Sequence, residues 1–128
     1  MLKEVVAPAL RRHNFKGSGG EYLLPDAGAW ALVGFQRSDV SSAQAVKFTI
    51  NLKVVSRSTW DDARHEQTWL PERPKANSRY PVGEWSERIG KLMPDGEDHW
   101  WWVRPDDDPS QVGAEVVTAL ARPLHAAI

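Results

Sequence analysis

Apolar and polar residues alternate strictly between positions 46 and 54, the most regular pattern in the chain. One side of this segment holds Val46, Phe48, Ile50, Leu52 and Val54, and the other holds Lys47, Thr49, Asn51 and Lys53. Because successive side chains of a strand point to opposite sides of a sheet, this pattern predicts a strand with one face on a core and the other near water. Residues 29–37 are apolar on both faces until their end, which predicts a central strand.

Three more segments complete the predicted sheet. Residues 21–25 form a short strand that turns back through Asp26-Ala27-Gly28 into the central strand. Residues 84–92 and 99–103 are expected to form a hairpin around the turn Pro94-Asp95-Gly96. Since no helix separates the first three strands, the sheet is predicted to be antiparallel.

A helical pattern opens the chain. Residues 2–13 place apolar side chains on one face, namely Leu2, Val5, Val6, Ala9 and Leu10. Asn14 is expected to end this helix in the left-handed conformation, so that Phe15 packs back on it. The sequence Gly17-Ser18-Gly19-Gly20 is interpreted as a flexible turn, because it lacks the Lys-Ser or Lys-Thr of a phosphate-binding loop.

A second helical pattern closes the chain. Asp108 is the expected N-cap, and Pro109 takes the first helical position. The apolar stripe of this helix consists of Val112, Val116, Leu120 and Leu124. Pro123 is expected to mark the end of the helix.

The middle of the chain combines a short helix with a long loop. The helix is predicted to run from an N-cap at Ser58 to Gln67, with Asp61 in its first turn. Residues 70–83 contain three prolines and read as an ordered loop, and loops of this length often have a function. The whole pattern predicts one α+β domain over residues 1–128, an antiparallel sheet of about five strands with the N-terminal and C-terminal helices packed on it.

The chain has seven tryptophans, and three of them are consecutive at positions 100–102. No single face of a strand can hold all three, because successive side chains point to opposite sides. If Trp100 and Trp102 face the core, Trp101 faces outward, or the reverse. We therefore expect the sheet to be covered on both faces or to present a large aromatic side chain to a partner.

Composition excludes several classes of protein. A hydrophobic content of 41% with 26% charged residues is that of a soluble globular domain. The 16 basic residues are balanced by 17 acidic ones, so no overall field would attract nucleic acid or an anionic membrane. There is no cysteine, no apolar run long enough for a membrane span and no signal-peptide core at the N-terminus. We expect a cytoplasmic protein that binds neither nucleic acid nor a membrane.

The side chains that could carry catalysis form no recognisable constellation. The four histidines are scattered, without the spacing of a helical zinc site. The acidic groups Asp61-Asp62 and Asp106-Asp107-Asp108 fall at expected helix starts, where a carboxylate favours the helix dipole. Ser, His and Asp occur without a nucleophile elbow. The sequence therefore predicts no catalytic residue, no metal site and no cofactor.

Polar side chains placed in strands are better candidates for a site. Gln36 ends the central strand, Asn51 interrupts an outward face, and Arg88 lies in the fourth strand. Together with His99 they could converge beside an exposed indole of Trp101 if the outer sheet face is concave. Arginine binds carboxylates and phosphates bidentately, and Arg and Trp are enriched at binding hot spots. We predict these five as ligand-binding residues, the alternative being that they satisfy structural hydrogen bonds of the sheet.

Several segments together resemble a known family. They are His13-Asn14-Phe15, Gly34-Phe35-Gln36-Arg37, Phe48-Thr49-Ile50-Asn51-Leu52, Arg88-Ile89-Gly90 and Trp100-Trp101. These features resemble the DUF4304 family, a group of mostly bacterial proteins of unknown function. The family usually has Gly-Phe where this chain has Asn14-Phe15, and Asn is the next-best residue for a left-handed cap. The resemblance implies a fold but no activity and no catalytic residues.

The expected function is that of a non-catalytic binding module for a protein or peptide partner, using the Trp-rich sheet face and the 70–83 loop. One alternative is a small-molecule or carbohydrate binder that stacks its ligand on an indole. Another is an enzyme that uses Arg88 and His99.

Overall fold

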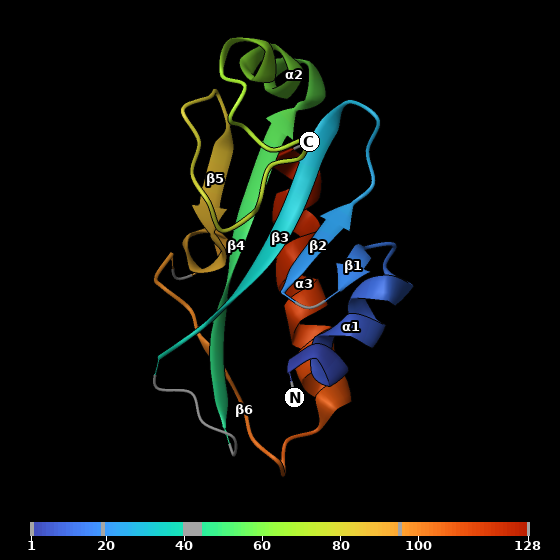
Figure 1. The fold of residues 1–128 in the computed structure, drawn as a ribbon. Coiled ribbons are helices and arrows are strands. Elements are labelled where there is room, and N and C mark those ends of the chain that lie inside the picture. Colours follow the sequence, from blue (N-terminus) through green and yellow to red (C-terminus); the bar gives the residue numbers. More distant parts are fainter. Residues whose placement is uncertain (1, 19, 40–44, 95, 128) are drawn as a thin grey trace.

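The fold is that of a single α+β unit, seen in a computed structural model that describes residues 2–18, 20–39, 45–94 and 96–127 (Figure 1). Its elements in chain order are α1 (Leu2–Arg12), β1 (Lys16–Ser18), β2 (Glu21–Leu24), β3 (Ala29–Arg37), β4 (Val46–Ser56), α2 (Arg57–Glu66), β5 (Trp85–Arg88), the 3-10 helix η1 (Ile89–Leu92), β6 (Trp101–Val103) and α3 (Pro109–Ala127). The predicted fold class is confirmed. Within the described residues, no helix is both long and apolar enough to cross a membrane.

The sheet is antiparallel, with strand order β1-β2-β3-β4-β5, and β6 also pairs with β4. β3 lies between β2 and β4, as its apolar sequence predicted. β4 pairs with β3 along one edge, from Phe48 opposite Arg37 to Ser56 opposite Ala29. β5 and β6 therefore follow one another along the other edge of β4 (Figure 1).

The predicted hairpin of residues 84–92 and 99–103 is wrong, because β5 and β6 each pair with β4. The strand ends at Arg88, where Ile89 turns into the core and η1 begins. The chain then turns, as the Gly96 N–H donates to the Met93 carbonyl at 2.9 Å, and regains strand geometry only at Trp101. Asp95 of the expected turn lies outside the described residues.

The main core lies between the sheet and the helices α1 and α3, and Figure 1 shows α3 behind the sheet and α1 beside β1. The apolar face of β4 points into it, as the alternation predicted, and meets Val6 and Leu10 of α1 and Val116 and Leu120 of α3.

Asp108 caps α3, since its Oδ1 accepts the Ser110 N–H at 3.0 Å. The expected end at Pro123 is wrong: α3 continues to Ala127, because a proline removes one helical hydrogen bond without stopping the chain. The side chain of Leu124 lies outside the described part.

The other face of β4 is covered in part, which corrects the second half of that prediction, and Lys47 and Asn51 on this face are half-buried. Thr49 and Lys53 are both 0% exposed. The segment between α2 and β5 has no helix or strand, as expected for the 70–83 loop, and lies over this face. The Lys53 ammonium donates to the carbonyls of Lys75, at 3.0 Å, and Ser78, and it pairs with Glu84 at 3.2 Å. This buried lysine fastens the loop to the sheet.

Two turns differ from expectation. The N-cap of α2 is Ser56, not Ser58, and its hydroxyl accepts the Thr59 N–H at 3.1 Å; Asp61 therefore lies beyond the first turn. The Gly-rich sequence at 17–20 contains the end of a strand, β1, which pairs with β2. Gly17 has a φ of 140°, and a Cβ there would lie 3.0 Å from the Tyr22 Cα, so only glycine fits this close pairing.

The predicted left-handed cap of α1 is confirmed, with φ of 71° at Asn14 and a buried Phe15 whose N–H donates to the Leu10 carbonyl. In the tryptophan run, Trp101 faces the core, which is the second of the two arrangements considered from the sequence. Trp101 is 7% exposed and stacks on Phe48, with ring centroids 5.5 Å apart, whereas Trp102 is 38% exposed.

Candidate functional site

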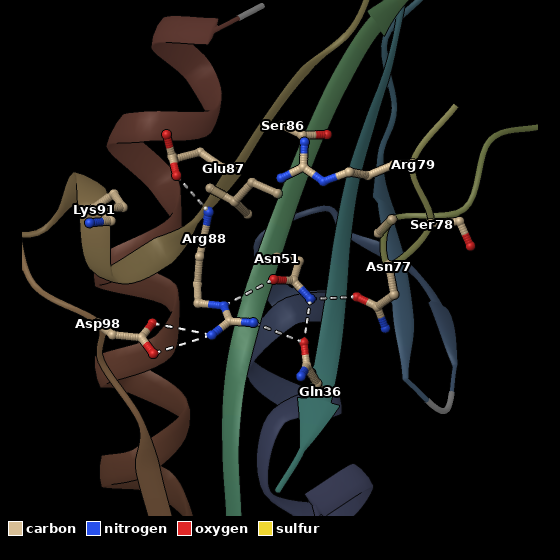
Figure 2. Close-up of a pocket in the computed structure, with 12 residues that line it drawn as sticks. Gln36, Asn51, Asn77, Ser78, Arg79, Ser86, Glu87, Arg88, Lys91 and Asp98 are labelled. Atoms are coloured by element: carbon tan, nitrogen blue, oxygen red, sulfur yellow. Dashed lines mark hydrogen bonds and ion pairs between the residues drawn. The ribbon is translucent and has the colours of Figure 1, made fainter. Parts of the chain in front are cut away.

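A polar hollow of about 490 Å³ lies on the sheet face that is turned away from α1 and α3 (Figure 2). Its floor is formed by β3, β4 and β5, and one wall is the loop segment 76–79. The polar side chains that shape it include Gln36, Asn51, Asn77, Arg79, Arg88 and Asp98. We refer to this site as the polar hollow.

The register of the sheet brings three of the predicted site residues together. Asn51 of β4 lies directly opposite Gly34 of β3 on one side and Arg88 of β5 on the other. Paired residues of neighbouring strands point to the same face, and so do residues two apart in one strand. Gln36 therefore shares the outer face with Asn51 and Arg88.

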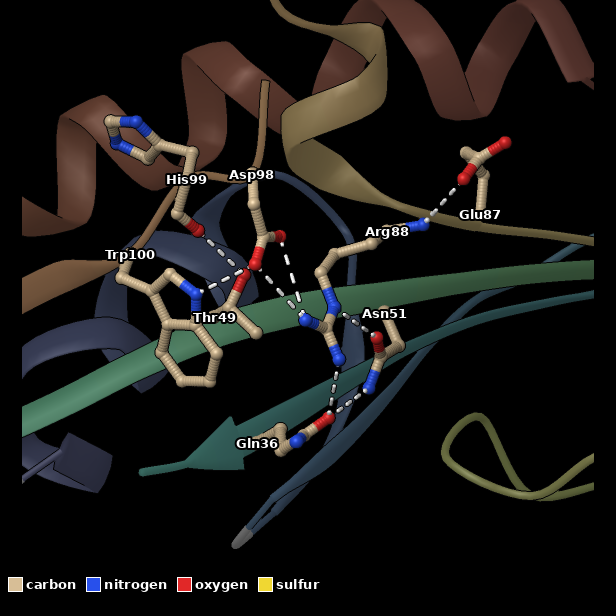
Figure 3. Close-up of polar contacts among 8 residues, drawn as sticks. All are labelled: Gln36, Thr49, Asn51, Glu87, Arg88, Asp98, His99 and Trp100. Carbon is tan, nitrogen blue, oxygen red and sulfur yellow. Dashed lines mark hydrogen bonds and ion pairs between the residues drawn. The ribbon is translucent and has the colours of Figure 1, made fainter. Parts of the chain in front are cut away.

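These residues form one hydrogen-bonded network, drawn in Figure 3. The Arg88 guanidinium donates from Nε to Asn51 Oδ1 at 3.5 Å and from Nη2 to Gln36 Oε1 at 3.3 Å. Asn51 Nδ2 donates to Gln36 Oε1 at 3.0 Å and to Asn77 Oδ1 at 2.9 Å. The network thus joins three strands to the loop.

Asp98 closes the network on the other side of the guanidinium, 3.2 Å from Arg88 Nη1. The Trp100 indole donates to the same carboxylate at 2.9 Å. This hydrogen bond is the main cause that holds the pKa of the Asp98 carboxyl below its ordinary value; slight burial opposes it, and the charge of Arg88 supports it. Asp98 is therefore a stable anion that orients both Arg88 and Trp100.

Two glycines allow close approaches at the walls of the polar hollow, Gly34 in β3 and Gly90 in η1. A Cβ on Gly34 would lie 2.8 Å from the Ala76 Cβ and closer still to Asn77 Oδ1. A Cβ on Gly90 would lie 2.8 Å from the Asp98 Cα. Asn77 and Asp98 were missed by sequence reasoning because they lie in aperiodic segments. The sequence did contain one sign of the loop that lies over β3. Gly34 stands inside a strand pattern, and a glycine there signals the close approach of another backbone.

His99 and Trp101 do not join the polar hollow. The His99 carbonyl accepts the Thr49 hydroxyl at 2.6 Å, and its imidazole packs edge-on against Trp101, pointing away from Arg88 (Figure 3). Trp101 is buried in the main core. Trp100 is the indole beside Arg88, with the guanidinium carbon 5.5 Å from its ring centroid.

A second, more apolar hollow has a volume of about 1110 Å³, and we call it the Trp groove. It runs between residues 92–94 and 99–102 on one side and the exposed side of α3 on the other, and its walls include Met93, Trp100, Trp102 and Thr118. The two linings are linked by a hydrogen bond, because the indole of Trp100, which lines the Trp groove, donates to Asp98, which lines the polar hollow.

The Trp groove carries cations on its aromatic rims. The Lys47 ammonium lies 5.3 Å from the Trp100 ring centroid and 5.8 Å from that of Trp102, and the Arg104 guanidinium carbon lies 4.9 Å from Trp102. Such contacts hold an exposed indole in one orientation. Among the residues that the structure describes, no group of three His, Cys, Asp or Glu side chains could hold a metal ion.

Comparison with known proteins supports the resemblance seen in the sequence. The family described as "Domain of unknown function (DUF4304)" matches residues 6–126. The chain belongs to the DUF4304 family. No curated protein and no solved structure shows a significant match to it. In this DUF4304 protein, the segments that carry the resemblance contribute Gln36, Asn51, Arg88 and Trp100 to the network or its border.

The geometry around Asp98 in this DUF4304 protein gives a first prediction. Trp100→Phe removes the indole N–H, so the pKa of Asp98 should rise toward its ordinary value, measured by an NMR titration of the carboxyl carbon. Because the folded-state pKa is lowered, ionised Asp98 contributes stability above its ordinary pKa, and this contribution is lost as the pH falls through the lowered pKa. The decrease in the free energy of unfolding at acidic pH should therefore be smaller in Trp100→Phe than in the wild type.

Trp102→Phe is the matched control, because the Trp102 indole makes no contact with Asp98 among the described hydrogen bonds. An equal change of the Asp98 pKa in both variants would show that the Trp100 hydrogen bond is not its cause.

Proposed function

We propose that this protein is a binding module that engages an extended segment of a protein partner with the polar hollow and the Trp groove together. The observation that carries the proposal is the contact of Arg88, Asp98 and Trp100 at the border of the two hollows. One ligand that crosses this border would meet hydrogen-bonding groups on one side and indoles on the other.

The dimensions and residue types of the two hollows support a peptide segment. The two volumes of about 490 and 1110 Å³ together exceed those typical of small-molecule pockets. Tryptophan and arginine are the residue types that most often dominate the energy of a protein interface. The 70–83 loop contributes the wall at residues 76–79, which supports a part for this loop in the proposed binding.

The alternatives receive less support. Carbohydrate binding in the polar hollow would call for an indole face, and the described residues that line it include no tryptophan. An enzyme using Arg88 and His99 would need both side chains in one site, and they face different hollows. The balanced charge and the absence of cysteine support, as parts of this proposal, a protein partner in the cytoplasm.

Selection of peptides tests the proposal. A phage-displayed library of random peptides is selected on the immobilised full chain, and each enriched peptide is titrated into the ¹⁵N-labelled protein. We expect amide shifts at Asn51, Asn77 and Arg88 and at the indole of Trp102. Trp102→Ala should weaken binding by about tenfold or more, because an exposed indole in an interface is a typical hot spot.

Trp69→Ala is the matched control. Trp69 is 65% exposed, but it follows α2 at the opposite end of β4 from Trp102. The proposal fails if no peptide is enriched, if the shifts map to another face, or if both substitutions weaken binding equally.

A further inference from the structure

The Arg88 guanidinium is oriented by side chains of the sheet as well as by Asp98. Its Nε donates to Asn51 Oδ1 at 3.5 Å, and its Nη2 donates to Gln36 Oε1 at 3.3 Å. Both acceptors stand on strands that pair with each other, β3 and β4. A guanidinium can only donate hydrogen bonds, so the third nitrogen, Nη1, also calls for an acceptor. The acceptor that it meets is the Asp98 carboxylate (Figure 3).

Two N–H donors from different segments converge on the place that this carboxylate occupies. Arg88 Nη1 lies 3.2 Å from Asp98 Oδ2 and 3.5 Å from Oδ1, and the Trp100 indole donates to Oδ2 at 2.9 Å. The charge of Lys91 adds to that of Arg88 in favouring an anion here. A cation and an indole N–H that share one carboxylate oxygen form a charge-assisted donor set, which would hold the carboxylate of a ligand by the same contacts.

Asp98 is the replaceable member of this contact. Its side chain is 50% exposed and that of Arg88 is 35% exposed, and an ion pair so near the surface contributes little to stability. Residues 97–100 belong to no helix or strand. Their backbone is nevertheless anchored, because the Thr49 hydroxyl donates to the His99 carbonyl at 2.6 Å. The Asp98 side chain alone would therefore have to turn toward water to leave both donors to another carboxylate.

The charges of the polar hollow leave room for one further carboxylate. The cations that line it are Arg79, Arg88 and Lys91, and the acids are Glu87 and Asp98. Asp98 stays in the neighbourhood when its side chain turns away, so one incoming carboxylate brings this lining to charge balance. A phosphate dianion would bring one negative charge more than the cations of the lining can match.

We infer that Arg88 and Trp100 form a carboxylate-binding site, which Asp98 fills in the free protein and which an acidic group of the partner segment takes over on binding. The inference rests on the proposed function only for the source of the carboxylate, the C-terminus or an acidic side chain of that segment. Asp98 links the linings of the two hollows, so a segment that lies in both passes its carboxylate. Asp98 is thus an internal competitor, which keeps both donors paired until a group of the same chemistry replaces it.

Acetate is the probe for this site, and Asp98→Ala is the variant that opens it. The ¹⁵N-labelled full chain is titrated with sodium acetate, with sodium chloride at equal ionic strength as the blank and acetamide as the neutral counterpart. Without the internal competitor, Asp98→Ala should bind acetate about tenfold more tightly than the wild type, observed at the Trp100 indole and Arg88 Nε signals. Acetate binding of equal strength in both proteins, or equal shifts with acetamide, would overturn the inference.

Asp106→Ala is the matched control. It removes one carboxylate at an exposed position outside both linings, so it makes the same change of net charge and should bind acetate as the wild type does. Asp98→Asn serves if Asp98→Ala does not fold, because it keeps the shape of the side chain without its charge. It should also bind acetate more tightly than the wild type, and a folded Asp98→Asn protein that does not would contradict the role of Asp98.

The donor role of Trp100 is tested in the Asp98→Ala background. Trp100→Phe removes one of the two donors and should weaken acetate binding severalfold, whereas Trp69→Phe, which changes an exposed indole far from Asp98, should leave it unchanged. A folded Asp98→Ala/Trp100→Phe protein that binds acetate as tightly as Asp98→Ala would show that Trp100 is not part of the site.

The enriched peptides keep this inference and the proposed function apart. If Asp98→Ala binds acetate as expected but no peptide is enriched, the carboxylate site stands and the protein-partner proposal fails. If the peptides lose affinity when their carboxylates are converted to amides, and bind Asp98→Ala more tightly than the wild type, both stand. If the peptides bind equally in both forms and to both proteins, the protein-partner proposal stands and the exchange with Asp98 is overturned.

Discussion

Replacement of Lys53 by methionine is expected to lower the free energy of unfolding by about 3–5 kcal/mol, measured by urea denaturation. Lys53 is completely buried, and its ammonium holds Glu84 and two loop carbonyls. Burial lowers the pKa of Lys53, and the ion pair with Glu84 opposes this, so these partners are what retain the charge. Methionine fills much of the space but leaves an unpaired carboxylate and two carbonyls without a donor.

A second substitution identifies the cause of that loss. Glu84→Leu in the Lys53→Met background removes the unpaired carboxylate, so it should restore part of the stability. It should not restore all of it, because the carbonyls of Lys75 and Ser78 still lack their donor. A Lys53→Met protein that unfolds at the same urea concentration as the wild type would show that this lysine does not fasten the loop.

Phe48→Ala is expected to cost about 3–5 kcal/mol of stability. Phe48 is completely buried between Phe35, at a centroid distance of 5.7 Å, and Trp101. The truncation leaves a cavity against two rings and removes their aromatic contacts. The loss is measured by thermal or urea unfolding, with tryptophan fluorescence as the signal.

Phe48→Leu is the conservative control and should cost less, since most of the apolar volume is kept. If the Phe48→Ala protein melts as the wild type does, then the apolar face of β4 is not the core face.

Much of the fold could be predicted because its strands carry periodic sequence signals. The alternation from Val46 to Val54 identified β4 and its core face, and the apolar segment 29–37 identified the central strand. The cover on the other face of β4 could not be predicted, because the loop that provides it has no periodic pattern of its own. Lys53 therefore resembled a solvent-exposed lysine, although the loop buries it.

The residues of the candidate site could also be predicted only in part. Gln36, Asn51 and Arg88 occupy strand positions of one phase, so their convergence followed from the pattern of the sheet. His99 and Trp101 were placed with them because the phase of the tryptophan run was open. That phase is fixed by the pairing of Trp101 with Phe48, a contact between residues far apart in the sequence. Such a pairing leaves no sign in the local pattern.

β5 and β6 lie along the same edge of β4, and the residues between these two strands include Asp98 and Trp100. β5 and β6 are each anchored to β4 by their own ladder, and residues 89–100 form a bridge between the two anchors. Because each strand is held by its own ladder, we expect substitutions at exposed positions of this bridge to leave the register of both strands unchanged. Substitutions in this bridge that keep the buried Ile89 and Gly90 are therefore expected to alter what the polar hollow accepts and to leave the sheet intact.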